Sequence, residues 1–104
     1  MKAIVYHAIR MNPLPDTSVA VDLTKFKKVA EVEDDTTNKN AMLNIAFRDT
    51  NHIDESWTEN GNVTAFGDVN RLRSTSVGDL VEIDGTFVMC DMVGWVKVNV
   101  LETA

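Results

Sequence analysis

The residues with the most reactive side chains in this sequence are two histidines and a single cysteine: His7, His52 and Cys90. A zinc site needs several such ligands at short local spacing, and these three are spread along the chain, so we predict no metal site. A nucleophilic thiol must be exposed and stabilised as a thiolate. Cys90 instead stands in a predicted strand, and we interpret it as a core residue. We interpret His7 as a polar residue of a strand and His52 as a loop residue.

Carboxylates are the commonest titratable groups, with 16 Asp and Glu against 10 Lys and Arg. General acid–base catalysis needs one carboxyl group in a desolvated place that raises its pKa. No local pattern marks such a place, so we expect solvated surfaces for both local groups of acids. These groups are Asp54, Glu55 and Glu59, and Asp79, Glu82 and Asp84. A cation could touch Asp34 and Asp35, but the spacing of a calcium-binding loop is missing.

Glycine-rich phosphate-binding patterns are missing as well, because the 5 glycines form neither a G-x-x-x-x-G-K nor a G-x-G-x-x-G sequence. The sequence therefore predicts no catalytic residue, no cofactor-binding residue, no metal ligand and no cofactor. We expect a protein that is not an enzyme. A small hydrolase or transferase remains an alternative, although no pairing of a nucleophile with a base stands out.

The net charge is −6, with an isoelectric point near 4.7. Phosphate backbones and anionic membranes repel such a chain, so we expect no direct binding to nucleic acid or membranes. Solubility is the simplest explanation of the charge; the alternative is an acidic surface that meets a basic protein partner. No apolar run is long enough to span a bilayer, and the N-terminal stretch lacks the features of a signal peptide. We therefore expect a cytoplasmic protein.

The length of 104 residues predicts a single domain that spans residues 1–104. Apolar residues on both faces of Lys2–Ile9 indicate a central strand. Phe26–Glu33 is predicted as a second strand, with a short helix as the competing interpretation. Thr37 or Asn38 can cap a helix over Lys39–Asp49. We expect that helix to turn four apolar side chains toward a sheet, namely Met42, Ile45, Ala46 and Phe47.

The last third has the clearest pattern. Val77–Ile83 and Phe87–Met92 are predicted strands, and Asp84-Gly85 between them is a strong signal for a two-residue hairpin turn. A further turn at Val93-Gly94 leads to a predicted strand over Trp95–Leu101. By contrast, His52–Asn70 is predicted as a long, partly ordered loop, with a helical turn as an option within it. The fold class is therefore α+β: a small antiparallel sheet, made of a C-terminal three-stranded meander and the N-terminal strand, with one packed helix.

A local step of basic and hydroxyl residues precedes the meander: Arg71, Arg73, Ser74 and Ser76. It could position a phosphate or an acidic partner, but we favour serines that bond to the local backbone, with Asp79 accepting from the same backbone. The two tryptophans are the natural anchors of any interface. We place Trp95 in the core, whereas Trp57 fits a core and an interface equally well.

The stretch from Arg73 to Gly85, RSTSVGDLVEIDG, together with Gly94-Trp95 downstream, resembles the signature of the YodL-like small domains of bacteria, conjugative plasmids and phages. The shared pattern is a serine-rich step, an apolar strand, a turn, a second strand and a glycine–aromatic ending. The resemblance extends over the chain from Phe26 onward. Family members often carry serine at the place of Gly78 and phenylalanine at that of Trp95, and Asp54–Asn70 is longer than usual. The resemblance implies a small α+β fold and a mobile-element origin, but no activity.

Our leading hypothesis is a non-enzymatic accessory protein of a phage or mobile element, which binds a protein partner and possesses an acidic surface suited to a basic one. The candidate partner surface comprises Glu31, Glu33, Asp34, Asp35, Trp57, Arg71 and Arg73. An alternative is an acidic mimic of DNA that inhibits a nucleic-acid-binding protein. Its stripe of carboxylates would comprise Glu31 to Asp35 with Asp49, Asp54, Glu55 and Glu59.

Overall fold

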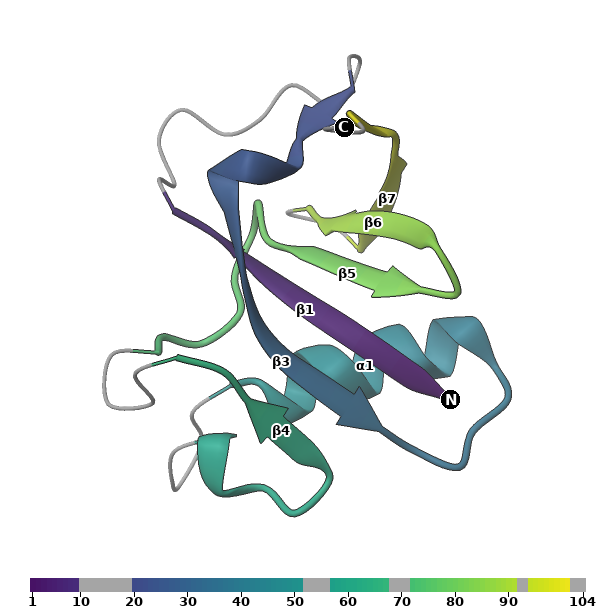
Figure 1. Ribbon diagram of the computed structural model, residues 1–104. Coiled ribbons are helices and arrows are strands. Elements are labelled where there is room, and N and C mark those ends of the chain that lie inside the picture. Colours follow the sequence, from purple (N-terminus) through teal and green to yellow (C-terminus); the bar gives the residue numbers. More distant parts are fainter. Residues whose placement is uncertain (10–19, 52–56, 68–71, 92–93, 102–104) are drawn as a thin grey trace.

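The computed structural model describes residues 1–9, 20–51, 57–67, 72–91 and 94–101. An antiparallel sheet of six strands forms its centre, in the order β4-β3-β1-β5-β6-β7 (Figure 1). The strands are β1 (Lys2–Ala8), β3 (Phe26–Glu33), β4 (Val63–Ala65), β5 (Leu80–Ile83), β6 (Thr86–Cys90) and β7 (Trp95–Val98). The other elements are helix α1 (Lys39–Asp49), two single turns of 3-10 helix, η1 (Leu23–Lys25) and η2 (Trp57–Glu59), and the strands β2 (Val21–Asp22) and β8 (Val100–Leu101), which pair in parallel. The predicted α+β class is confirmed.

The first strand lies in the middle of the sheet, between β3 and β5, as the apolar residues on both of its faces predict. Phe26–Glu33 is a strand and not a short helix. The pairing of β1 with β3 shifts by one residue at Val29, because Val5 faces Ala30 while Tyr6 faces Lys28. Such a bulge lets two successive side chains point the same way. Val29 and Ala30 accordingly both belong to the core cluster beneath the helix.

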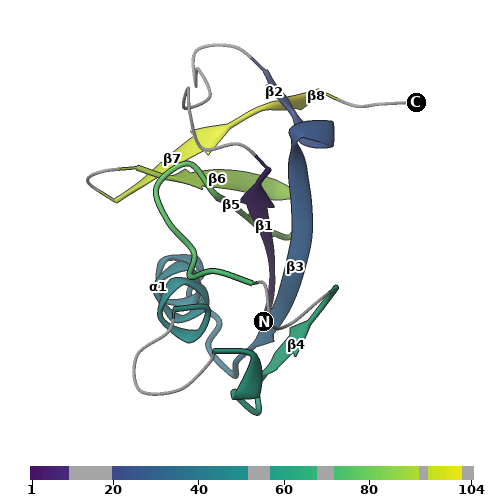
Figure 2. The same cartoon turned by 90° about the vertical axis from the view of Figure 1, so that its left-hand side faces the viewer.

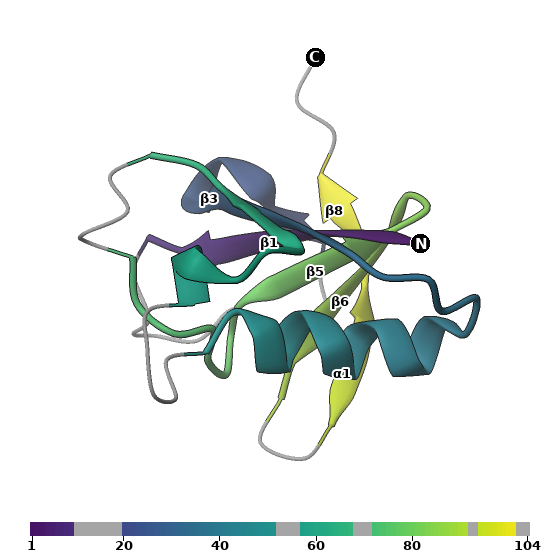
Figure 3. The same cartoon turned by 90° about the horizontal axis from the view of Figure 1, so that it is seen from below.

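Helix α1 covers one face of the sheet, where it packs on β1 and β5 (Figures 2 and 3). Asn38 caps it, since its side-chain oxygen accepts a hydrogen bond from the backbone N–H of Ala41 at 3.1 Å. The prediction that Phe47 faces the sheet is wrong: Phe47 is 36% exposed. At 3.6 residues per turn, Phe47 points to the side of the buried helix stripe, where it meets the ring of Trp95 edge-on. That stripe comprises Met42, Leu43 and Ala46.

A second core cluster fills the opposite face of the sheet at one end, near β2 and β8. Its buried members are Ala8, Val21, Phe26, Leu80, Met89 and Val98. The predicted strand over Trp95–Leu101 is divided into two. Strand β7 continues the meander by pairing with β6, whereas Val100 in β8 pairs with Val21 in β2. Cys90 is buried, as expected.

The hairpin turn at Asp84-Gly85 is confirmed, with φ angles of 51° and 82°. Its strands are shorter than predicted, because Val77-Gly78 form a turn, with Gly78 at a φ of 95°, and β5 begins only at Leu80. At the other end β6 stops at Cys90. The predicted residues Met92 and Val93 lie outside the described residues.

Within the predicted loop over His52–Asn70, the helical turn is present as η2, but the described part, residues 57–67, also contains a strand that was not predicted. Strand β4 pairs with β3, with Val63 opposite Val32 and Ala65 opposite Ala30. A strand of three residues leaves almost no alternation in the sequence, so its pairing depends on the neighbouring strand. His52, Asp54 and Glu55 lie outside the described residues.

We expect Gly85→Ala to lower the free energy of unfolding by about 1–2 kcal/mol, because a side chain disfavours the positive φ of this position. An added Cβ meets no atom within 4 Å at Gly85, so the cost is conformational and not steric. Gly61→Ala is the matched control, since its Cβ also meets open space and Gly61 is not among the positive-φ residues. Denaturant titration measures both; equal midpoints would contradict the assigned turn.

We expect Met42→Ala to destabilise the protein by about 2–5 kcal/mol, the usual cost of a cavity at a fully buried position. Met42 is 0% exposed and packs in the cluster between α1 and the sheet. Asn44→Ala, on the exposed side of the same helix, should change stability by no more than about 0.5 kcal/mol. Similar losses in the two variants, measured by chemical denaturation, would show that α1 does not bury the assigned face.

Candidate functional site

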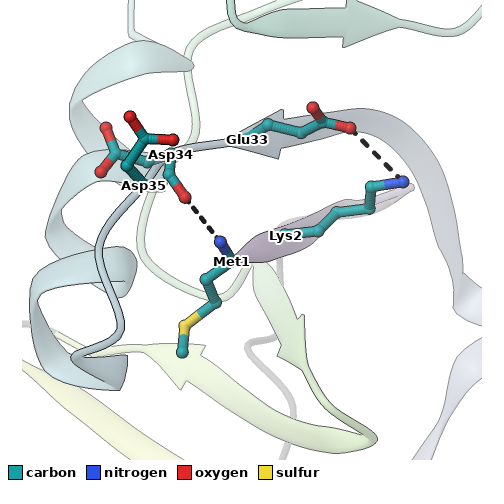
Figure 4. Close-up of a pocket in the computed structure, with 5 residues that line it drawn as sticks. All are labelled: Met1, Lys2, Glu33, Asp34 and Asp35. Carbon is teal, nitrogen blue, oxygen red and sulfur yellow. Dashed lines mark hydrogen bonds and ion pairs between the residues drawn. The ribbon is translucent and has the colours of Figure 1, made fainter.

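Three acidic residues gather where β3 ends and the chain turns toward α1. We call Glu33, Asp34 and Asp35 the acidic corner. Together with Met1 and Lys2 they line an open hollow of about 570 Å³ (Figure 4). The pairing of Lys2 with Glu33 in the sheet brings the start of β1 beside the end of β3. The hollow therefore follows directly from the register of these two strands.

The acids of this corner differ in how far they are already neutralised. The Lys2 ammonium lies 3.4 Å from Glu33 and 3.6 Å from Glu31, and Lys28 also contacts Glu31. Asp34 is occupied locally, because one carboxylate oxygen accepts from the N–H of Thr36 and its backbone oxygen accepts from the amino group of Met1. Asp35 is exposed and has no ion pair among the described residues. Asp35 thus offers the most accessible negative charge.

Trp57 and Arg73, which also belong to the predicted partner surface, lie outside the acidic corner, and the prediction for Trp57 needs correction. Trp57 is only 1% exposed, and its indole N–H donates to the backbone oxygen of Arg73 at 2.9 Å. It is a core residue and cannot anchor an interface in this conformation. Arg71 lies outside the described residues. Trp95, expected in the core, is half-buried at its edge.

Arg73 and Asp79 form an ion pair that the sequence analysis missed, because Asp79 was expected on a solvated surface. Asp79 is 0% exposed, and the Arg73 guanidinium donates to its two carboxylate oxygens at 2.6 and 2.8 Å. The backbone N–H groups of Ala8 and Ser76 donate to the same carboxylate, each at 2.8 Å. The bond from Ser76 is the local backbone contact that was predicted. Arg73 is therefore engaged within the fold and does not offer a free anion site.

A chain of polar side chains lies beside this ion pair. His7 Nε2 is 2.9 Å from the Thr75 hydroxyl, which is 2.7 Å from the Thr50 hydroxyl. A hydrolase of the Ser-His-Asp type uses one imidazole nitrogen for the nucleophile and the other for the carboxylate. Here the same Nε2 faces both Thr75 and Asp79, the latter at 3.9 Å, and Thr75 is buried at 2% exposure. The arrangement suits a structural network and does not form such a triad.

Several described acids of the stripe expected for a mimic of DNA are paired within the fold. Glu31 is paired with two lysines. The Asp49 carboxylate accepts from the Arg48 side chain and from the Asn62 amide, at 2.9 and 2.7 Å. Asp54 and Glu55 lie outside the described residues, as does the side chain of Glu59. The structure thus brings together Glu31, the acidic corner and Asp49, because the Asn62 amide that donates to the Asp49 carboxylate also donates to the backbone oxygen of Glu33. The paired acids among them do not offer the row of free carboxylates that a mimic of DNA needs.

The described residues contain no group of three or more histidine, cysteine or acidic side chains placed to hold a metal ion. No helix among them is both long and apolar enough to cross a membrane. Comparison with known protein families, with curated proteins and with solved structures yields no match for this chain. The function must therefore be argued from the chemistry of the sites themselves.

We expect Asp79→Ala to destabilise the protein by about 3 kcal/mol. The substitution leaves the N–H groups of Ala8 and Ser76 and the Arg73 guanidinium without their acceptor, and breaking a buried pair costs about 3–5 kcal/mol. The lower end applies because the Arg73 side chain is 37% exposed. Asp35→Ala, which removes an exposed acid, is the control and should stay within about 0.5 kcal/mol. Thermal and chemical denaturation measure both variants. Equal stabilities of Asp79→Ala and Asp35→Ala would contradict the assigned ion pair between Arg73 and Asp79.

Proposed function

We propose that this chain is a non-enzymatic accessory protein that binds a basic protein partner through the acidic corner. The observation that carries the proposal is the shared hollow, where Glu33, Asp34 and Asp35 line a single open space (Figure 4). Lysine or arginine side chains of a partner fit such a site, because they can reach exposed carboxylates without either charge being buried. A fixed backbone supports the site, since β1 and β3 meet there.

The strength expected from this corner is modest. An exposed ion pair contributes about 0.2–1 kcal/mol, so the corner alone cannot hold a partner tightly. Its main effects are faster encounter and selection against acidic partners, because complementary charges act on association rate and specificity. The net charge of −6 acts in the same direction. We therefore propose that the acidic corner orients the partner, while neighbouring surface supplies further contacts.

The resemblance to YodL-like domains supports the biological side of the proposal. It suggests an origin in a phage or another mobile element, which makes a host protein or a protein of the same element the natural partner. We propose that the encounter takes place in the cytoplasm, of the host cell if the protein is phage-encoded. Direct binding to nucleic acid is not part of the proposal, because the acidic surface opposes it.

The test compares two variants with the same net charge. Glu33→Gln with Asp35→Asn removes two acids from the corner, whereas Asn44→Lys with Asn99→Lys adds two positive charges at exposed positions elsewhere. Both should fold like the wild type. Each immobilised protein is exposed to bacterial lysate at low and at physiological salt, and captured proteins are identified and their affinities measured. We expect the corner variant to bind its partner roughly fivefold more weakly, from about 0.5 kcal/mol for each lost ion pair.

Three results would contradict the proposed function. A partner retained equally by the wild type and the corner variant would show that the acids play no part. Equal losses in the two variants would show that only net charge matters. Binding that does not weaken as salt rises would exclude an electrostatic contact, because salt screens exposed charges over about 8 Å at physiological ionic strength.

A further inference from the structure

The segment from Leu72 to Asp79, which we call the strap, is neither a strand nor a helix. It contacts the end of α1 at Thr50 and the sheet at Cys90. Backbone hydrogen bonds hold it to the end of α1 and to β6. The N–H of Thr75 donates to the oxygen of Thr50, the N–H of Gly78 donates to the oxygen of Cys90, and the N–H of Cys90 donates to the oxygen of Asp79. Side chains of the strap also enter the interior, where Thr75 and Asp79 are buried. The strap is therefore held by polar contacts together with Leu72, which packs against the core cluster beneath the helix.

The hydroxyl groups near His7 can be assigned a direction by counting their hydrogens. Each threonine hydroxyl has a single hydrogen to donate. Thr50 lies 2.7 Å from the backbone oxygen of Ala46, which can only accept, so Thr50 donates there. The contact between Thr75 and Thr50 then uses the hydrogen of Thr75.

His7 must consequently donate from Nε2 to Thr75, across the contact of 2.9 Å. The direction of the chain is thus from His7 through Thr75 and Thr50 to the last turn of α1. In its neutral form His7 carries its hydrogen on Nε2, while Nδ1 carries none. The chain joins three parts of the molecule: β1, the strap and the end of α1.

The carboxylate of Asp79 has no capacity left for His7. Two oxygens offer about four acceptor positions. One oxygen accepts from the N–H of Ala8 and from Arg73, and the other accepts from Ser76 and from Arg73. A second proton on His7 would therefore create a buried cation without a hydrogen-bonded counter-ion.

We propose that His7 is an acid-sensitive latch: neutral and protonated on Nε2, it holds the strap closed, and uptake of a second proton favours a state with the strap detached. The physical reason is the cost of a charge in a desolvated place without a compensating bond. Detachment exposes the imidazole to water, where a charged form is stable. Acid therefore shifts the population toward the open strap.

The charged surroundings of His7 agree with this direction. In the strap, Arg73 repels an imidazolium and Asp79 attracts it. In β3, Lys27 is the sheet neighbour of His7 and is exposed. In β6, the buried Cys90 lies near Asp79 and is uncharged, since burial raises the pKa of its thiol. The remaining neighbours, Trp57, Thr75 and Thr50, are neutral. Burial lowers the pKa of His7 to about 4; Asp79 opposes this shift and Arg73 reinforces it.

The sign of the pH dependence follows from these values. The open strap gives His7 its ordinary pKa of 6.5, and the closed strap gives it a pKa of about 4. The open state therefore binds the proton more readily, and the ratio of open to closed rises by up to tenfold for each pH unit between 6.5 and 4. The complete change is roughly 300-fold. Above pH 6.5 the ratio is constant.

The first experiment is nuclear magnetic resonance of the wild-type protein with ¹⁵N-labelled histidine. We expect the nitrogen shifts of His7 at neutral pH to identify the neutral Nε2–H form, and the imidazole of the folded protein to remain neutral until about pH 4. A neutral form with its hydrogen on Nδ1 would reverse the assigned chain and overturn the proposal. Titration of the folded protein near pH 6.5 would overturn it as well.

The second experiment measures hydrogen exchange of the strap, with the N–H groups of Thr75 and Gly78 as reporters and those of Thr86 to Met89 in β6 as an internal reference. Cys90 is left out of the reference, because its N–H donates to the Asp79 oxygen of the strap. In the wild type, protection of the reporters should fall as pH decreases from 6.5 to 4, after correction for intrinsic exchange, while β6 stays protected. His7→Gln keeps a donor near the position of Nε2 but cannot take up a proton, so its protection should not depend on pH in this range.

The matched variant His7→Asn places its amide too far from Thr75 and should expose the strap at every pH. The same acid response in wild type and His7→Gln would overturn the proposal, as would parallel loss of protection in the strap and β6. Should His7→Gln fail to fold, the form and titration of His7 in the wild-type protein still decide the outcome.

Discussion

The burial of the Asp79 carboxylate is the constraint on which this part of the fold depends. A charge with 0% exposure is tolerated only when its lone pairs are satisfied. The required donors come from the strap itself and from Ala8 at the end of β1. The strap and the strand must therefore be in place together, since neither can satisfy the carboxylate alone. The Asp79 backbone extends the same requirement to β6, because its oxygen accepts from the N–H of Cys90.

Elements with local signals could be predicted from the sequence. The cap at Asn38 and the apolar spacing after it define α1, and Asp84-Gly85 defines the hairpin, because each pattern lies within a few residues. The first strand follows from the apolar residues on both of its faces, whereas the sequence of Phe26–Glu33 also allows a short helix, and its pairing with β1 makes it a strand. Register and the bulge at Val29 could not be predicted, since they depend on which strand lies beside β3 and not on the sequence of β3 alone.

The polar interior was not predictable for a related reason. In the sequence, Asp79 cannot be told from a surface acid. One of the donors that satisfy its buried carboxylate is the N–H of Ala8, which is 71 residues away along the chain. The residues that flank Trp57 in the sequence are polar, so they give no sign of its burial. The backbone oxygen that accepts from its indole N–H belongs to Arg73, 16 residues further along the chain. The serine-rich step before Asp79 was the available signal, because polar residues adjoining an apolar strand can supply local donors. The acidic corner was easier to find, as its charges are consecutive, but the pairing of Lys2 with Glu33 required the sheet.

The acidic corner and the His7 latch lie at opposite ends of β1, which makes them electrostatically separate. Lys2 and Ala8 are about 20 Å apart along a strand of this length, well beyond the screening length of about 8 Å. A partner charge at Asp35 therefore exerts little direct force on His7. Mechanical communication is the other route, because α1 begins next to the corner and ends at Thr50. Opening of the strap would release the last turn of α1, where the Asp49 carboxylate accepts from the Asn62 amide that also donates to the backbone oxygen of Glu33 in the acidic corner. The hollow proposed to receive the partner is thus coupled to the strap through Asn62, while the pairing of β1 with β3 stays in place.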